Sequence, residues 1–488
     1  MAQFYPTAAT LATGFPADVV RPGRSRVPSA NPQLPNPQLP NPKLANPQLA
    51  QLHRHLATAG GRLYLGAGMG GVALAPPEQA VLVLGPPRSG KTTALAIPNV
   101  LAAPGAVVVT STKADVLAAT AGARAALGRC WLLDPSGTIQ APEGMTRLRW
   151  SPVGAATTWD ESLVLARAMT GAARPQGRAG ESAHWTERAE AVLGPLLHAA
   201  HLSGAGMDTV VRWVLGQQLE PARAALVGHG VDTAAAVLAG IAATDAREQS
   251  GIWSSTAGIL AAYRSDAALD NAAAPNFDPR RLAGGKDTVY VCAPARYQDL
   301  VAPIVVAFLE QVRAGVYAAA PTGRPAVALV LDELANIAPI PDLPALVSEG
   351  GGQGLLTLAC LQDLSQARQR WGPAAEGFLS LFGTKVVLPG IGDLATLDLV
   401  SRLGGEIDVP ARSVNRPSWG WGAASVTWAT HRQRRLPVEA VSQQPPGAGL
   451  VLAGARPPER VGLPPWWAVP MFQPVRVPEQ PSGRSISG

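Results

Sequence analysis

Short, continuously apolar runs recur along the chain, each only a few residues long. Strands that helices cover on both faces show this pattern, whereas a half-exposed strand alternates apolar and polar positions. Helix-compatible stretches, such as residues 300–317 and 365–371, alternate with several of the runs. The alternation predicts an α/β fold with a doubly wound, mostly parallel sheet. The predicted strands are residues 80–84, 106–110, 131–134, 288–292, 327–331, 355–360 and 386–388.

The strand-like runs stop between about residue 160 and about residue 264. Alanine-rich segments such as residues 187–201 and 234–243 take their place and predict an all-helical insertion between the early and the late strands. The patterns divide the chain into five segments. They are a proline-rich arm (1–60), a first part of the α/β domain (61–159), the all-α insertion (160–280), a second part of the α/β domain (281–456) and a proline-rich tail (457–488).

The arm contains a five-residue repeat, NPQLP-NPQLP-NPKLA-NPQLA, between Asn31 and Ala50. Each proline fixes φ and removes a backbone donor, so we expect neither helix nor sheet to propagate through the repeat. The arm is therefore predicted to be a disordered, extended spacer. A docking peptide for a partner's groove is the alternative.

Composition narrows the picture only slightly. The chain has 488 residues, of which 15% are charged, and a formal net charge of +6, which permits a polyanionic partner without requiring one. The three cysteines are far apart in apolar surroundings, which predicts buried thiols in a reducing compartment. We expect no signal peptide and no run near the roughly 20 apolar residues of a membrane helix. The prediction is a cytoplasmic protein that reaches the inner face of the cell membrane only through a partner.

One motif carries specific chemistry. The segment from Gly85 to Thr92, GPPRSGKT, matches G-x-x-x-x-G-K-[ST] and lies between a predicted strand and a predicted helix. Backbone N–H groups of such a loop converge on the phosphates of a nucleotide, Lys91 reaches the β- and γ-phosphates, and the Thr92 hydroxyl joins the shell of Mg²⁺. The sequence therefore predicts an ATP site. Its nucleotide-binding residues are predicted to be Gly85, Pro86, Pro87, Arg88, Ser89, Gly90, Lys91, Thr92 and Thr93.

A second half of this site follows the apolar run 327–331. Asp332 is predicted to hold Mg²⁺ through water and Glu333 to orient or deprotonate the attacking water, because both carboxylates come directly after a buried strand. Gln362 follows the next strand and is predicted to sense the γ-phosphate. Ser111, Thr112 and Lys113 follow another strand at the same edge, where ligands gather, although a simple helix start explains them equally well.

From about residue 65 to about residue 457, these segments resemble the type IV secretion coupling proteins, the conjugative DNA-transfer ATPases of the TraD/TraG type. The matching pieces are GPPRSGKTTALAIPNVL, VVVTSTKADV, LLDPSG and the long segment that begins LDELANI and contains LQDLSQ. The resemblance implies a RecA-like P-loop motor with an inserted all-α domain. It also implies a hexameric ring around a DNA channel, ATP sites between subunits, and contacts with a relaxosome or secretion-channel proteins.

Two features depart from that family. Many relatives carry N-terminal transmembrane helices where this chain has the proline-rich arm. Relatives also often place a basic residue in the turn after the strand at 327–331, but residues 349–353, EGGGQ, contain none. An arginine that reaches the ATP of a neighbouring subunit would then be Arg368, Arg370 or Arg402.

The sequence evidence for DNA contact lies near residues 412–435. Arginines there would hold phosphates and tryptophans would stack on single-stranded bases, although a flexible basic loop with packed tryptophans explains the same residues. The predicted function is an ATP-driven motor that moves DNA to a secretion channel. The alternatives are a ring translocase for DNA segregation or packaging, and a secretion ATPase with a protein substrate. The candidate DNA contacts are Arg412, Arg416, Arg432, Arg434, Arg435, Trp419, Trp421 and Trp428.

Overall fold

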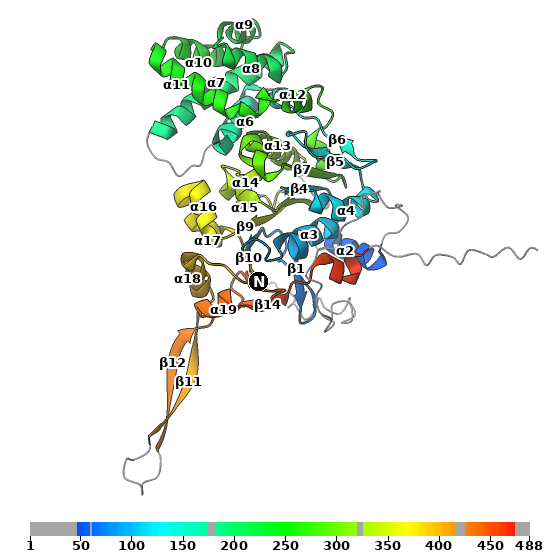
Figure 1. The fold of residues 1–488 in the computed structure, drawn as a ribbon, viewed down its shortest axis with the longest axis vertical. Coiled ribbons are helices and arrows are strands. Elements are labelled where there is room, and N and C mark those ends of the chain that lie inside the picture. Colours follow the sequence, from blue (N-terminus) through cyan, green and yellow to red (C-terminus); the bar gives the residue numbers. More distant parts are fainter. Residues whose placement is uncertain (1–45, 59–60, 174–180, 320–325, 416–424, 474–488) are drawn as a thin grey trace, which may run out of the picture.

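The computed structural model describes residues 46–58, 61–173, 181–319, 326–415 and 425–473. A twelve-stranded sheet runs through the molecule in the order β2-β1-β14-β13-β10-β3-β9-β8-β4-β7-β5-β6, with helices on both faces (Figure 1). Its strands are β1 (Tyr64–Gly68), β2 (Gly71–Leu74), β3 (Val81–Leu84), β4 (Val107–Ser111), β5 (Cys130–Leu133), β6 (Thr146–Arg147), β7 (Thr288–Cys292), β8 (Val327–Leu331), β9 (Leu355–Leu361), β10 (Thr384–Val387), β13 (Ala448–Ala453) and β14 (Glu459–Gly462).

The strands from β10 to β6 in this order are all parallel, and the four remaining strands add an antiparallel edge beyond β10. All seven predicted strands are present, and none of their ends is displaced by more than two residues. The prediction of a doubly wound, mostly parallel α/β sheet is therefore confirmed. Strands β1, β2, β6, β13 and β14 were not predicted.

The sheet has a separate hydrophobic core on each face, because successive strand residues point to opposite sides. In β3, Val81 and Val83 belong to the core on one face, whereas Leu82 and Leu84 belong to the core on the other. The first face is covered by α2 (Pro47–Thr58), η3 (Lys91–Ala96), α3 (Ile97–Ala102) and α4 (Asp115–Ala125).

The second face carries the helical insertion and the later helices of the α/β domain. All elements described between β6 and β7 are helical, and Figure 1 shows most of them stacked at one end of the molecule. They are α5 (Pro152–Ala155), α6 (Trp159–Ala173), α7 (Glu181–Leu202), α8 (Met207–Leu215), α9 (Glu220–Gly228), α10 (Asp232–Ala242), α11 (Ala246–Ile259), η4 (Ala261–Arg264), α12 (Asp266–Ala272) and η5 (Pro279–Leu282). The five-part division of the chain stays a prediction.

The remaining elements follow β7. They are η6 (Ala295–Tyr297), α13 (Gln298–Ala318), α14 (Leu334–Ile337), α15 (Leu343–Glu349), α16 (Leu364–Trp371), η7 (Gly372–Gly377), α17 (Phe378–Leu381), α18 (Leu394–Leu403), α19 (Val438–Ser442), η8 (Trp466–Ala468) and η9 (Pro470–Phe472). A two-stranded antiparallel hairpin, β11 (Glu406–Asn415) and β12 (Ser425–Arg434), projects from the end of the molecule opposite the helical insertion (Figure 1).

One expectation about membrane helices was wrong. The helical segment Ala295–Ala318 contains an 18-residue window with a mean hydropathy of 1.5, and it is long and apolar enough to cross a membrane by length and composition. Within the fold, 67% of its apolar window is buried, and α13 packs against α6 and η5 in the core. A central core helix passes the same test because neighbouring elements surround it.

The end of the arm also differs from the prediction. The last unit of the repeat begins a helix, because Asn46 precedes α2 and its side-chain oxygen accepts a hydrogen bond from the backbone N–H of Gln48 at 3.0 Å. Pro47 occupies the first helical position, where the missing donor has no cost. Helix α2 then buries Leu52 and Leu56 against the core. The arm up to residue 45 lies outside the described residues.

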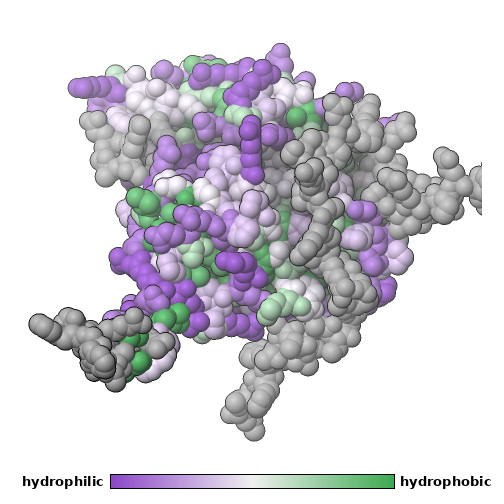
Figure 2. All heavy atoms as spheres, turned by 60° about the horizontal axis from the view of Figure 1, so that its bottom comes forward, coloured by the Kyte–Doolittle hydropathy of each residue, from purple (hydrophilic) through white to green (hydrophobic). Residues whose placement is uncertain are grey.

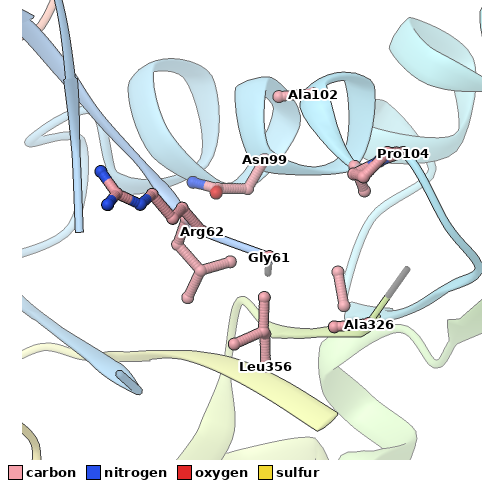
Figure 3. Close-up of a pocket in the computed structure, with 10 residues that line it drawn as sticks. Gly61, Arg62, Asn99, Ala102, Pro104, Ala326 and Leu356 are labelled. Atoms are coloured by element: carbon pink, nitrogen blue, oxygen red, sulfur yellow. The ribbon is translucent and has the colours of Figure 1, made fainter. Parts of the chain in front are cut away.

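Two features lie at the edge of the sheet where the central strands begin. Figure 3 shows a small hollow between α3 and the first residues of β8 and β9, lined by Arg62, Asn99 and Leu356 among others. The glycine-rich turn before β9 lies at the same edge. A Cβ added to Gly351 would lie 1.8 Å from the backbone oxygen of Glu78, so close backbone packing explains the glycine there.

Candidate nucleotide site

The phosphate-binding loop connects β3 to the helix that follows it. The backbone N–H of Gly85 donates to the carbonyl of Leu361 at 3.2 Å, which ties the start of the loop to the end of β9. Gly90 has a φ of 101°, in the region that favours glycine, and it turns the chain into the helix. The sequence thus folds locally as the motif requires, with the loop at the carboxyl edge of the sheet.

The helix after the loop begins with a π-helical turn, η3, and continues as α3. Its widened turn is closed by a hydrogen bond from the N–H of Ile97 to the carbonyl of Thr92. Pro98 has no N–H to continue the α-helical pattern, and its ring would press on the preceding turn, so a wider turn relieves that contact. The predicted helix is therefore present, with a distortion that was not predicted.

Lys91 lies folded back onto the loop. Its Nζ donates to the carbonyl of Gly85 at 2.5 Å and to that of Pro86 at 3.0 Å. These carbonyls hold the ammonium within the loop, so it can exchange them for phosphate oxygens without leaving the site. Pro87 and Arg88 are exposed at the tip of the loop. Ser89 and Thr93, which are also among the predicted nucleotide-binding residues, lie in the loop and in the first turn of the helix that follows it.

Thr92 and Asp332 meet although 240 positions separate them. The Thr92 hydroxyl lies 2.8 Å from one carboxylate oxygen of Asp332 and 3.0 Å from the other. Asp332 is 5% exposed, and burial, helped by the negative charge of Glu333, raises the pKa of its carboxyl to about 7. A hydroxyl beside a carboxylate is a donor set that suits Mg²⁺, so these residues fit the predicted metal role.

Glu333 follows Asp332 and lies between several polar groups. Its carboxylate accepts a hydrogen bond from Asn336 Nδ2 at 3.1 Å. Burial raises the pKa of the Glu333 carboxyl, while the positive charges of Lys91 and Lys113 oppose that rise. A carboxylate whose pKa is raised accepts a proton more readily, which suits the predicted role of a general base.

Gln362 lies between the two halves of the site. Strand β9 pairs with β3 on one side and with β8 on the other, so the residue after β9 lies between the phosphate-binding loop and Asp332. Gln362 is half-buried, and its backbone N–H donates to the side chain of Gln366 at 3.0 Å. The structure therefore brings Gln362 to the predicted edge, and its sensor role stays a prediction.

Comparison with known proteins places the chain in a family. The family model for "Type IV secretory system Conjugative DNA transfer" matches residues 40–439. The chain belongs to this family. No curated protein sequence matches it.

Solved structures agree with the fold. The bacterial conjugative coupling protein TrwBdeltaN70, in an unbound form, is 17% identical, with a TM-score of 0.64 over 85% of this chain and 91% of that chain. The plasmid coupling protein TrwB in complex with ADP and Mg²⁺ is 17% identical, with a TM-score of 0.62 over 85% and 92% of the two chains. The same protein in complex with a non-hydrolysable GTP analogue is 18% identical, with a TM-score of 0.62 over the same shares. These likenesses support a RecA-like α/β fold for this family member.

The three arginines proposed to reach a neighbouring ATP site all have partners within the chain. Arg368 pairs with Glu376 at 3.2 Å and with Asp393 at 3.5 Å. Arg370 donates to the carbonyl of Ala172 and thereby joins α16 to α6. Arg402 is exposed and pairs with Asp398 at 2.8 Å, an exposed pair that opens at little cost. The assignment of such an arginine stays a prediction.

The basic region proposed to contact DNA is a β-hairpin over its described residues, not a flexible loop. Arg432 pairs with Glu406 at 2.8 Å, and Arg434 pairs with Asp398 at 2.6 Å. Arg435 and Trp428 are exposed, Arg412 lies opposite Trp428 in the ladder, and Arg416, Trp419 and Trp421 lie outside the described residues. DNA contact by these residues stays a prediction.

Sequence reasoning missed one contact and left another open. Asn336 bonds Glu333, and its position three residues later, at the start of a helix, could have suggested the contact. Lys113 was an open candidate, and its charge acts on Glu333. Strand β4, which precedes Lys113, is the neighbour of β8. The order of the strands, which the sequence does not reveal, creates this proximity.

Proposed function

We propose that this chain is an ATP-hydrolysing motor that drives DNA to a type IV secretion channel during conjugation. The observation that carries the proposal is the meeting of Thr92, Asp332 and Glu333 beside the phosphate-binding loop. Membership of the conjugative DNA-transfer family supplies the biological direction of that chemistry.

The residues at the carboxyl edge divide the work of hydrolysis. Lys91 moves from the loop carbonyls to the β- and γ-phosphates and balances their charge, and the loop amides hold the remaining phosphate oxygens. Thr92 and Asp332 would hold Mg²⁺, which would neutralise charge on the phosphate oxygens. Glu333 accepts the proton of the attacking water, and Asn336 keeps its carboxylate in place.

The wider assembly rests on the family as well. A homo-hexameric ring with DNA in its centre would place each site at a subunit boundary, and partners in the relaxosome or the secretion channel would deliver and receive the DNA. The TrwB complexes with ADP and Mg²⁺ and with an ATP analogue support ATP and Mg²⁺ as the ligands of this chain. We place the motor at the cytoplasmic face of the membrane.

Steady-state ATP hydrolysis tests the proposal. Hydrolysis by the purified protein is measured with no DNA, with single-stranded DNA and with double-stranded DNA, at low salt because phosphate contacts weaken as salt rises. DNA is expected to stimulate hydrolysis. Lys91→Ala is expected to abolish hydrolysis, and Glu333→Gln to reduce kcat by roughly 100-fold or more while nucleotide still binds.

The outcomes separate the candidate functions. Hydrolysis that does not respond to DNA, at protein concentrations that allow rings to form, would favour a secretion ATPase with a protein substrate. Hydrolysis that persists in Lys91→Ala would show that the activity belongs to another site or to a contaminant.

A further inference from the structure

The hairpin β11–β12 is the part of the described structure that stands furthest from the two cores. Its strands pair with each other over ten residues each, and they form a sheet of their own. It projects from the body opposite the helical insertion (Figure 1). An element that leaves the core in this way is exposed on both faces and gains little stability from the rest of the fold.

The far part of one face carries three apolar side chains. Residues that are directly opposite in an antiparallel pair share a face, and so do residues two apart in a strand. Val414 is opposite Val426, and Trp428 lies two positions further along β12, so these three side chains line the same face. They are 43%, 44% and 67% exposed, and Figure 2, which brings this end forward, shows hydrophobic residues near the hairpin at lower left.

The root of the same face is polar and fixed. Glu406 pairs with Arg432 across the hairpin at 2.8 Å, and Arg434 donates to Asp398 of α18 at 2.6 Å. Arg434 also donates to Ser401 of the same helix at 3.2 Å. The bonds of Arg434 hold the hairpin to the body, and the three apolar side chains lie at a distance from it.

The net charge of the hairpin indicates the kind of surface that it fits. From residue 409 to residue 438 the sequence has no acidic residue but five arginines, and two of these, Arg432 and Arg434, are paired at the root. The occupant must therefore combine negative charge with an apolar phase that accepts two valines and a tryptophan. Single-stranded nucleic acid offers charge and flat bases for the tryptophan, but it offers no aliphatic phase for the valines.

A bilayer that contains anionic lipids offers all of these. Tryptophan is at its most stable at the boundary between headgroups and acyl chains, aliphatic side chains enter the acyl region, and arginines attract anionic headgroups. We propose that Val414, Val426 and Trp428 of the hairpin dock on the surface of an anionic lipid bilayer. Direct contact of this kind differs from our sequence-based expectation that the chain reaches a membrane only through a partner.

Vesicle flotation tests the proposal with the full chain. The protein is mixed with vesicles of equal parts phosphatidylcholine and phosphatidylglycerol, or of phosphatidylcholine alone. We expect the wild type to float with the anionic vesicles and much less with the neutral ones. The double variant Val426→Thr/Trp428→Thr keeps strand-forming residues but removes two apolar side chains, and it is expected to bind at least about tenfold more weakly.

Two controls separate docking from folding and from nucleotide chemistry. Leu215→Gln changes an apolar side chain that is 56% exposed on α8, in the insertion at the other end of the molecule, and should float like the wild type. Lys91→Ala should also float like the wild type, because the hairpin does not depend on the phosphate-binding loop. The thermal unfolding midpoints of all variants are compared with that of the wild type.

Three results would overturn the proposal. The first is a wild type that does not float with either vesicle. The second is a double variant that has the same thermal unfolding midpoint as the wild type and floats with the anionic vesicles as well as the wild type does. The third is a double variant that floats normally but no longer binds a single-stranded oligonucleotide. That result would show that the hairpin binds nucleic acid instead.

Discussion

Replacing Asp332 by asparagine should stabilise the ligand-free protein. The Asp332 carboxyl is buried, and its pKa is raised from 3.8 to about 7. The folded protein therefore binds this proton more tightly than the unfolded chain does. It follows that the carboxylate lowers the free energy of unfolding as the pH rises from about 4 to about 7, and that the full loss is present above pH 7.

The magnitude follows from the difference between the two pKa values. That difference corresponds to about 4 kcal/mol at a pH above both values. Asparagine has nearly the same shape, carries no charge, and its Oδ1 can still accept the hydrogen bond of Thr92. We expect Asp332→Asn to raise the free energy of unfolding by about 2–4 kcal/mol at pH 8, and the gain to shrink steadily between pH 7 and pH 4.

Urea denaturation at pH 8 and at pH 5, without nucleotide or Mg²⁺, measures the effect. Asp408→Asn, which neutralises an exposed carboxylate on the hairpin, should show no such pH-dependent gain. Adding ATP and Mg²⁺ should stabilise the wild type and leave Asp332→Asn nearly unchanged, because the variant loses a metal ligand. A variant that is less stable than the wild type at pH 8, or whose gain does not depend on pH, would refute the reasoning.

Three further changes test how the fold is held together. Gly351→Ala should destabilise the protein by about 1–3 kcal/mol in denaturant titrations, because its Cβ would meet the backbone of Glu78. The control Gly352→Ala should cost less than about 1 kcal/mol, because its Cβ would lie 3.7 Å from the nearest atom. Arg124→Met should lower the free energy of unfolding by about 3 kcal/mol or more, because the fully buried guanidinium donates to three backbone carbonyls and a threonine hydroxyl. An unchanged denaturant midpoint would show that water replaces the hydrogen bonds of the guanidinium. Asn46→Ala removes the cap of α2 and the bonds of its amide to Pro470 and Gln473, so limited proteolysis should cut α2 sooner than in the wild type, while equal cleavage rates would show that the cap contributes little.

The sequence predicted the central sheet well because its strands are buried on both faces. A buried parallel strand such as β8 or β9 is continuously apolar, and polar residues follow several of the predicted strands at the same edge, among them Asp332 after β8 and Gln362 after β9. That edge holds Lys91, Thr92, Asp332 and Glu333, so the candidate site could be predicted together with the strands.

The elements that were missed have weaker or contrary signals. The hairpin strands β11 and β12 are exposed on both faces, so their sequences contain no apolar run by which a strand could be predicted. Helix α2 begins inside a proline repeat, and proline is tolerated there only because it occupies the first helical position. The partners of the arginines in α16 and α18 depend on tertiary contacts that no local pattern reveals.

The central claim is that this chain moves along DNA at the expense of ATP. The direct measurement is displacement of streptavidin from one end of a biotinylated DNA strand, or of a third strand from a DNA triplex, by the purified protein. We predict displacement that requires ATP and Mg²⁺ and that is lost in Glu333→Gln, although this variant still binds nucleotide and DNA. Equal displacement by the wild type and by Glu333→Gln would contradict the account. So would a wild type that displaces nothing although DNA stimulates its ATP hydrolysis.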